Sequence, residues 1–150
     1  MNTYTLYLNS KRCIGCHGCV VHCKANKGLP VGPILCEISH ERLKSVRGVP
    51  KTEFKFRSCY HCEDPFCVTI CPTGAMKKRE DGIVYVDAPT CIGCMACAGA
   101  CPWGIPQHNP ETNKAVKCDY CMDRLDAGLQ PACVTKCTTH ALKLMTMKEI

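Results

Sequence analysis

Cysteine spacing constrains this chain more than any other feature of its sequence. Of 150 residues, 17 are cysteine, and sixteen of these fall into four groups of four. Groups one and three share the spacing C-x2-C-x2-C-x3-C, whereas groups two and four open with C-x2-C and have a longer gap before the third cysteine. In chain order, the groups are Cys13, Cys16, Cys19 and Cys23; Cys59, Cys62, Cys67 and Cys71; Cys91, Cys94, Cys97 and Cys101; and Cys118, Cys121, Cys133 and Cys137. A chain so rich in thiols is a disulfide framework, a zinc protein or an iron–sulfur protein.

The first residues and the hydropathy pattern bear on the disulfide alternative, because disulfides persist mainly in exported proteins. Met1 to Ser10 contains no basic n-region, no apolar core and no twin arginine. No apolar run approaches the length of a membrane span. We therefore expect a cytoplasmic protein without a membrane span, whose free thiols bind metal.

The spacing of groups one and three is that of the bacterial ferredoxins, whose cysteines hold [4Fe–4S] cubanes. Three cysteines in so tight a loop can each bind a different iron of one cube. Gly15, Gly18 and Gly93 let the backbone bend around the inorganic core and direct N–H groups at its sulfurs. The fourth cysteine lies just inside a helix and ligates a neighbouring cluster, so the groups work in pairs. The sequence therefore predicts four [4Fe–4S] clusters.

Zinc is the competing metal, because paired C-x2-C units are also typical of zinc ribbons. A zinc site takes its four ligands from two such units, however, and has no use for the third and fourth cysteines of each run. The net charge of +6 would suit a nucleic-acid partner. Four oxidised clusters with their thiolates, each carrying about −2, bring that charge to about −2. We therefore expect the basic surplus to balance buried clusters, and no nucleic acid to bind.

Alternating and turn-forming patterns predict a small α+β fold. The expected strands are 4–8, 53–57, 75–79, 83–87, 105–108, 114–117 and 141–146, and the expected helices are 19–27, 65–71, 95–101, 119–127 and 131–137. Strand, cysteine loop and helix thus recur four times as an internal repeat. Little apolar core is available to each unit, so the clusters are expected to act as folding nuclei.

The order of the groups, the C-x2-C-x4-C-x3-C-P spacing of group two and the long gap in group four resemble a known family. These features are similar to the four-cluster ferredoxin-like subunits of molybdopterin and tungstopterin oxidoreductases, from Cys13 to Cys137. The resemblance implies two bacterial-ferredoxin-like lobes: an outer one, residues 1–50 plus 105–150, with groups one and four, and an inner one, residues 51–104, with groups two and three. It also implies the ligands: Cys13, Cys16, Cys19 and Cys137 for cluster 1; Cys59, Cys62, Cys67 and Cys101 for cluster 2; Cys91, Cys94, Cys97 and Cys71 for cluster 3; and Cys118, Cys121, Cys133 and Cys23 for cluster 4.

The chain departs from the family pattern at three points. Cys23 and Cys137 are followed by Lys24 and Thr138 instead of proline, so the outer lobe is the less typical one. All sixteen ligands are cysteine, whereas some relatives replace one in group three and hold a [3Fe–4S] cluster. The long insertions and C-terminal extension of membrane-docked relatives are not present in this sequence, which favours a soluble complex.

The resemblance implies an electron relay between a larger pterin catalytic subunit, which the outer lobe would face, and a further redox subunit or soluble acceptor. The sequence itself shows no nucleotide loop and no nucleophile with a partnered base, so we expect a non-catalytic subunit. A freely diffusing polyferredoxin is the alternative function. A fixed subunit should carry a large apolar patch, including residues 29–35, whereas a diffusing carrier should show only a small charged one.

Several other residues have structural interpretations. Cys36 lies outside every group and is expected to be a small buried hydrophobe. His17 and His61 lie inside ligand loops and are expected beside a cluster or at the surface, not as ligands. Trp103 is expected to cover a cluster, and residues 77–79 (Lys-Lys-Arg) to form a solvated face.

Overall fold

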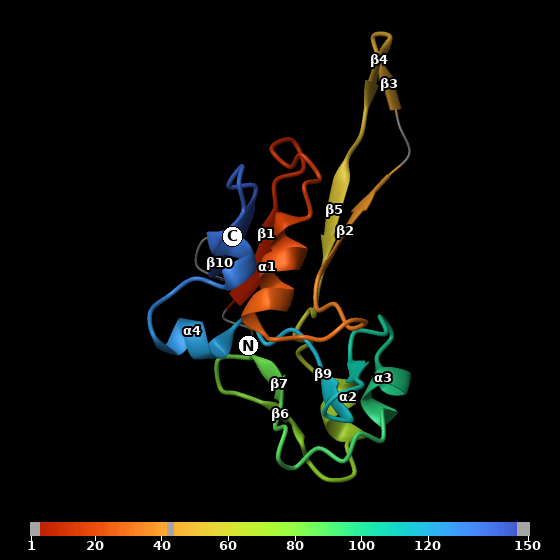
Figure 1. Ribbon diagram of the computed structural model, residues 1–150, viewed down its shortest axis with the longest axis vertical. Helices are drawn as coiled ribbons and strands as arrows, with labels where there is room; N and C mark the ends of the chain where they lie inside the picture. Colours follow the sequence, from red (N-terminus) through yellow and green to blue (C-terminus); the bar gives the residue numbers. More distant parts are fainter. Residues whose placement is uncertain (1–3, 42–43, 147–150) are drawn as a thin grey trace.

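The computed structural model describes residues 4–41 and 44–146 and shows a small mixed α/β protein built from short elements (Figure 1). Its strands are β1 (Tyr4–Leu8), β2 (Glu37–His40), β3 (Lys44–Val46), β4 (Val49–Lys51), β5 (Phe54–Arg57), β6 (Met76–Lys78), β7 (Val84–Val86), β8 (Gln107–Asn109), β9 (Lys114–Val116) and β10 (Leu142–Thr146). Its helices are α1 (Gly18–Asn26), α2 (Phe66–Thr69), α3 (Ala96–Ala100), α4 (Met122–Asp126) and α5 (Ala132–Thr135). In the part of the sequence so described, no helix has the length and apolar character needed to cross a membrane.

The strands form antiparallel pairs. β1 pairs with β10, so that Tyr4 lies opposite Thr146 and Leu8 opposite Leu142. β6 pairs with β7 and β8 with β9, in hairpins close to those that the sequence predicts. The first and last strands therefore belong to one structural unit, while the hairpins between them are local.

Among the described residues, helix α1 packs against α5 and helix α2 against α3. Helix α1 follows the first two cysteines of group one, and α5 lies in the stretch that carries the last two cysteines of group four. Helix α2 belongs to group two and α3 to group three. The fold thus brings group one beside group four, and group two beside group three.

Strands β2 and β5 continue into the hairpin β3–β4, which extends away from the rest of the protein at the top of Figure 1. The sequence predicted only the strand at 53–57 in this region. The turn between β3 and β4 uses Arg47 and Gly48, whose φ angles are +53° and +80°. Two positive φ angles suit a tight two-residue hairpin turn, although arginine is an uncommon residue there.

The buried residues form two clusters. The larger one includes Leu35, Ile38, Ile83 and Leu142, and the smaller one includes Met76, Val84, Cys97 and Ala115. Cysteines of the four groups lie inside both clusters. The apolar core is therefore built around the thiols and does not lie in a separate layer.

Candidate metal centres

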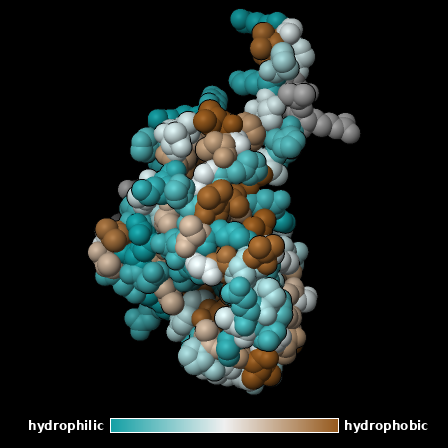
Figure 2. All heavy atoms as spheres, in the orientation of Figure 1, coloured by the Kyte–Doolittle hydropathy of each residue, from teal (hydrophilic) through white to brown (hydrophobic). Residues whose placement is uncertain are grey.

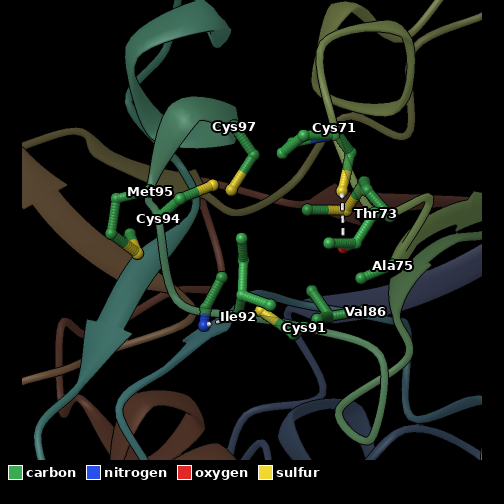
Figure 3. A pocket seen from close by; sticks show the side chains of 12 residues that line it. Cys71, Thr73, Ala75, Val86, Cys91, Ile92, Cys94, Met95 and Cys97 are labelled. Atoms are coloured by element: carbon green, nitrogen blue, oxygen red, sulfur yellow. Dashed lines mark hydrogen bonds between the residues drawn. The ribbon is translucent and has the colours of Figure 1, made fainter.

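Four cysteines from groups two and three line one cavity beneath helix α3 (Figure 3). Cys91, Cys94 and Cys97 come from the loop before α3 and its first turn, and Cys71 comes from the segment that follows α2. The rest of the lining is almost wholly apolar: Pro72, Thr73, Ala75, Met76, Val86, Ile92, Met95 and Ala115. These cysteines are the set expected to hold cluster 3.

A second cavity is lined by Cys59, Cys62, Cys67 and Cys101, the set expected to hold cluster 2. Tyr60 and Trp103 also line it, with their ring centroids 5.2 Å apart in an edge-to-face arrangement. Both rings are about half exposed, at 51% and 53%. Trp103 therefore lines the cavity of the set expected to hold cluster 2, and its role as a cover over that cluster stays a prediction.

The cysteines of groups one and four lie near one another around helices α1 and α5. Cys19 lies close enough to Cys137 and Cys13 for their charges, together with the larger effect of burial, to raise its pKa to about 11. A Cβ placed on Gly18 would lie 3.6 Å from Cys16 Sγ and 3.7 Å from the carbonyl oxygen of Lys136. The first three cysteines of group one thus gather beside the last cysteine of group four.

The other outer set gathers around Cys133. Burial raises the pKa of this thiol, and the nearby charges of Cys118, Cys23 and Cys121 raise it further. Cys23 comes from helix α1, whereas the other three belong to group four. The four neighbours are the set expected to hold cluster 4.

The cysteines of the cluster 2 and cluster 3 sets line cavities and do not converge on a point. Across residues 4–41 and 44–146, no three His, Cys, Asp or Glu side chains stand close enough to hold a single metal ion. A tetrahedral zinc site would bring its sulfurs to about 3.8 Å from one another, given Zn–S bonds of about 2.3 Å. A cubane instead needs separated thiolates, because each binds a different iron. The residues present therefore fit a cubane, and the ligand of each individual iron stays a prediction.

Backbone N–H groups direct hydrogen bonds at the thiol sulfurs. The N–H groups of Gly15 and His61 donate to Cys13 Sγ and Cys59 Sγ, at 3.5 and 3.4 Å. The Leu142 N–H donates to Cys137 Sγ at 3.4 Å. Such bonds stabilise negative charge on the sulfurs and raise the reduction potential of a bound cluster.

Burial and hydrogen bonding act in opposite directions on these thiols. Burial raises the pKa of Cys118 to about 12, although the Tyr120 N–H and the Lys117 ammonium lower it in part. Burial also raises the pKa of Cys71, but N–H groups of residues 73, 75 and 76 and the Thr73 hydroxyl outweigh it and lower the pKa below its ordinary value. Iron must therefore displace protons from the buried thiols as it binds.

Two threonines beside the cysteines were not singled out from the sequence. Thr73 Oγ1 lies 3.8 Å from Cys71 Sγ, and Thr139 Oγ1 lies 4.0 Å from Cys137 Sγ. The sequence does contain a signal for them. The repeat C-x-T-x-A occurs at 71–75 and 137–141, each time between a short helix and a strand.

The histidines and the seventeenth cysteine occupy different environments. His17 is exposed, whereas His61 is 1% exposed and its Nδ1 accepts a 2.8 Å hydrogen bond from the Val84 N–H. Burial, followed by the charge of Lys117, lowers the pKa of His61 to about 2, so its ring stays neutral. Cys36 is 4% exposed, which confirms that it is buried.

The basic residues 77–79 form ion pairs, whereas the sequence predicted only a solvated face. Each side chain meets a carboxylate: Lys77 pairs with Asp87 at 2.7 Å, Lys78 with Glu63 at 3.8 Å, and Arg79 with Asp126 at 2.8 Å. The side chains remain partly exposed, so each pair contributes little to stability by itself.

Comparison with known proteins identifies similar chains. A family model described as a 4Fe-4S dicluster domain matches residues 50–147, and a second with the same description matches residues 12–75. The thiosulfate reductase electron transfer subunit of Salmonella typhi is 43% identical over 99% of this chain and 78% of its own length. A component of anaerobic dimethyl sulfoxide reductase from Escherichia coli (strain K12) is 40% identical over 98% of this chain and 75% of its own. A component of tetrathionate reductase from Salmonella typhimurium is 38% identical over 97% of this chain and 59% of its own.

Proposed function

This protein belongs to the family of 4Fe-4S dicluster domains, as an electron-transfer subunit, and we propose that it relays single electrons between a larger molybdenum or tungsten pterin subunit and a second redox partner. Four [4Fe–4S] clusters, bound at the four cysteine sets, supply this chemistry, because each gains and loses one electron. The chain's own residues hold the clusters, exclude water from them and set their potentials.

The ligand sets that we propose for the four clusters are those implied by the cysteine spacing and the family resemblance. Two separate cavities support the sets of clusters 2 and 3, since each is lined by the four expected cysteines. The contact of α1 with α5 supports the exchange of Cys23 and Cys137 between the other two sets. The proposed division into an outer lobe, residues 1–50 plus 105–150, and an inner lobe, residues 51–104, follows from the same pairing.

Continuity between the cysteine sets is the observation that carries this function. Lys117 Nζ bridges two of the sets, because it lies 3.3 Å from Cys59 Sγ of the cluster 2 set and 2.7 Å from the carbonyl oxygen of Cys118 of the cluster 4 set. Each of these sets also adjoins its partner set within the same lobe. We therefore propose that electrons pass along the order cluster 1, cluster 4, cluster 2, cluster 3, or the reverse.

The two ends of this series approach the surface. Cys16 and Cys94, one in each terminal set, are exposed. Each is the second cysteine of a C-I-G-C loop. The isoleucines of these two loops, Ile14 and Ile92, are 61% and 65% exposed. An apolar residue next to an exposed ligand suits a docking contact that also excludes water. We propose that the Ile14 end meets the pterin subunit and the Ile92 end meets the second partner.

The apolar patch expected around residues 29–35 is only partly available for docking. Leu35 is buried in the protein's own core, while Val31 is 92% exposed. On the face seen in Figure 2, hydrophobic residues form several separate groups among polar ones. The docking contacts are therefore assigned to the two C-I-G-C loops and not to one large patch.

Anaerobic affinity purification followed by size exclusion and metal analysis tests the proposed function. We expect a stable complex with a larger subunit that contains molybdenum or tungsten, through an interface above about 1,000 Å² that survives high salt. Ile14→Ser should weaken the affinity for that subunit about tenfold, or about 1.4 kcal/mol, and leave the iron content unchanged. Ile92→Ser should spare this contact and weaken binding to the second partner.

Val31→Ser is the matched control, because Val31 is still more exposed but lies outside the cysteine loops. It should leave both contacts intact. A monomer free of molybdenum and tungsten that shuttles electrons between unrelated enzymes would establish the diffusing polyferredoxin instead.

A further inference from the structure

Lys117 is a buried cation at the junction between the cluster 2 and cluster 4 sets. It follows strand β9, directly precedes Cys118, and is only 5% exposed. Its side chain lines the cavity of the cluster 2 set. A lysine is rarely buried to this extent unless its charge is compensated.

The ammonium of Lys117 is held by groups from three segments of the chain. Nζ donates to the carbonyl oxygen of Cys118 at 2.7 Å and to the carbonyl oxygen of Val84 in β7. It also donates to Cys59 Sγ at 3.3 Å. The three bonds fix the charge between one cysteine of the cluster 2 set and the first cysteine of the cluster 4 set.

The hydrogen-bond partners do not include a carboxylate. Within the described ranges 4–41 and 44–146, no Asp or Glu lies within ion-pair distance of Lys117. Two carbonyl dipoles solvate an ammonium but do not neutralise it. The one partner able to carry a formal negative charge is the sulfur of Cys59. The compensating charge therefore lies on the Cys59 thiolate and on the cluster that it would hold.

We propose that Lys117 is the counter-charge shared by the cluster 2 and cluster 4 sites, a positioning residue that raises the reduction potential of both clusters and of cluster 2 the more. The inference rests on the ligand sets of the proposed function. Reduction adds one negative charge to a cluster, and a nearby fixed cation stabilises that charge. The effect is greater at cluster 2, because the ammonium contacts a sulfur there, whereas at cluster 4 it contacts only a backbone carbonyl. Because Lys117 raises the potential of cluster 2 more than that of cluster 4, it favours the electron on cluster 2 after transfer from cluster 4 across the junction between the lobes.

Lys117→Met tests the proposal in the full chain carrying its clusters, because methionine keeps an unbranched stem and removes the charge. We expect the midpoint potential of cluster 2, followed by EPR in an anaerobic redox titration, to fall by at least about 59 mV, which is tenfold in the one-electron equilibrium constant. Cluster 4 should shift in the same direction by less, and clusters 1 and 3 should keep their potentials. Unchanged potentials in a fully loaded Lys117→Met protein would overturn the proposal.

Lys114→Met is the matched control. Lys114 lies three residues away and its Nζ donates to the Cys91 carbonyl oxygen at 2.6 Å, without a bond to sulfur. The Lys114→Met variant should leave clusters 2 and 4 at their wild-type potentials. Equal shifts of these two clusters in both variants would show a general loss of positive charge, and would contradict a specific role for Lys117.

Lys117→Arg keeps the charge and covers the case in which the methionine variant does not assemble. If Lys117→Arg loads its clusters at near wild-type potentials while Lys117→Met fails to load, the charge is required and the proposal holds. Failure of both variants would mean that the shape of lysine matters and not its charge, and would overturn the proposal.

These measurements need no partner, so they are independent of copurification with a pterin subunit. A wild-type chain without iron would instead contradict the proposed function.

Discussion

Two glycines hold the C-I-G-C loops in a shape that a larger residue does not fit. Gly15 and Gly93 have φ angles of +65° and +73°, in the left-handed region that disfavours side chains. A Cβ on Gly15 would overlap the ring of Phe54, and one on Gly93 would overlap the carbonyl oxygen of Asn113. A ring can turn aside, but a backbone carbonyl in the β8–β9 turn is fixed. Gly93 is therefore the stricter of the two positions.

Gly93→Ala should lower the free energy of unfolding by more than about 2 kcal/mol and impair loading of cluster 3, since the clash adds to the left-handed strain of about 1–2 kcal/mol. Gly74→Ala separates the two effects, because Gly74 has a φ of +65° and no atom within 4 Å of an added Cβ. It should cost only the conformational strain and retain every cluster. Anaerobic chemical denaturation together with iron analysis gives both quantities. Equal losses in the two variants would show that strain alone matters.

In the proposed ligand sets, helix α1 is the element that couples clusters 1 and 4. Cys19 and Cys23 are four residues apart and both buried, so they lie on one face of the helix. The proposed ligand sets nevertheless assign them to different clusters, because helix α5 lies against α1 and brings its own cysteines alongside. A change at one of these residues should thus affect a cluster other than that of its own cysteine group.

Cys23→Ser should perturb cluster 4, otherwise held by Cys118, Cys121 and Cys133, and leave cluster 1 largely intact. The reason is that Cys23 lies near the group four cysteines, so that, after the larger effect of burial, its charge contributes to the raised pKa of Cys118 and of Cys133. EPR of the reduced protein and iron content would show the loss of one signal. Cys36→Ser is the control, because Cys36 is also buried beside Cys23 but belongs to no set. Loss of a cluster in that variant would mean that the seventeenth cysteine is a ligand.

The sequence predicted the cysteine-bearing elements well because their boundaries are marked by residues with special chemistry. The strands at 4–8 and 141–146 and the helices after the cysteine loops lie within a few residues of β1, β10 and the observed helices. Cysteine, glycine and proline spacing is a local signal, and it survives in any context. Which groups pair is not local, and only the family resemblance indicated it.

The sequence did not predict the extended hairpin or the role of Lys117, for two physical reasons. The β3–β4 strands are short and exposed, with Val46 and Val49 at 51% and 64%, so they lack the alternation that marks a half-buried strand. Lys117 is one of many lysines in the sequence, and its burial depends on Val84 and Cys59, which are distant in the chain. Tertiary contacts of this kind leave no periodic signal.

At the scale of the whole molecule, the clusters supply both charge balance and core volume. Seven of the nineteen buried hydrophobic residues in the described ranges, proline not counted, are cysteines, and six of these belong to the four sets. The net charge of +6 falls to about −2 when four clusters bind, which relieves the repulsion among the basic residues. The apoprotein therefore lacks part of its core and keeps all of its excess positive charge.

Removal of the iron should accordingly unfold the protein and not merely inactivate it. Anaerobically purified protein should contain about sixteen irons and as many acid-labile sulfides, four per cubane. Acid release of the clusters, followed by return to neutral pH with a chelator and a thiol reductant, should abolish the far-UV circular dichroism of the native state and its cooperative denaturant transition. The physical reason is that buried thiols would then line empty space and Lys117 would lose its counter-charge.

Restoration of iron and sulfide should restore both signals, whereas zinc should not. An iron-free protein that keeps its circular dichroism and unfolds cooperatively would show that the polypeptide core alone is sufficient, and stoichiometric zinc in the native protein would replace the cubane interpretation.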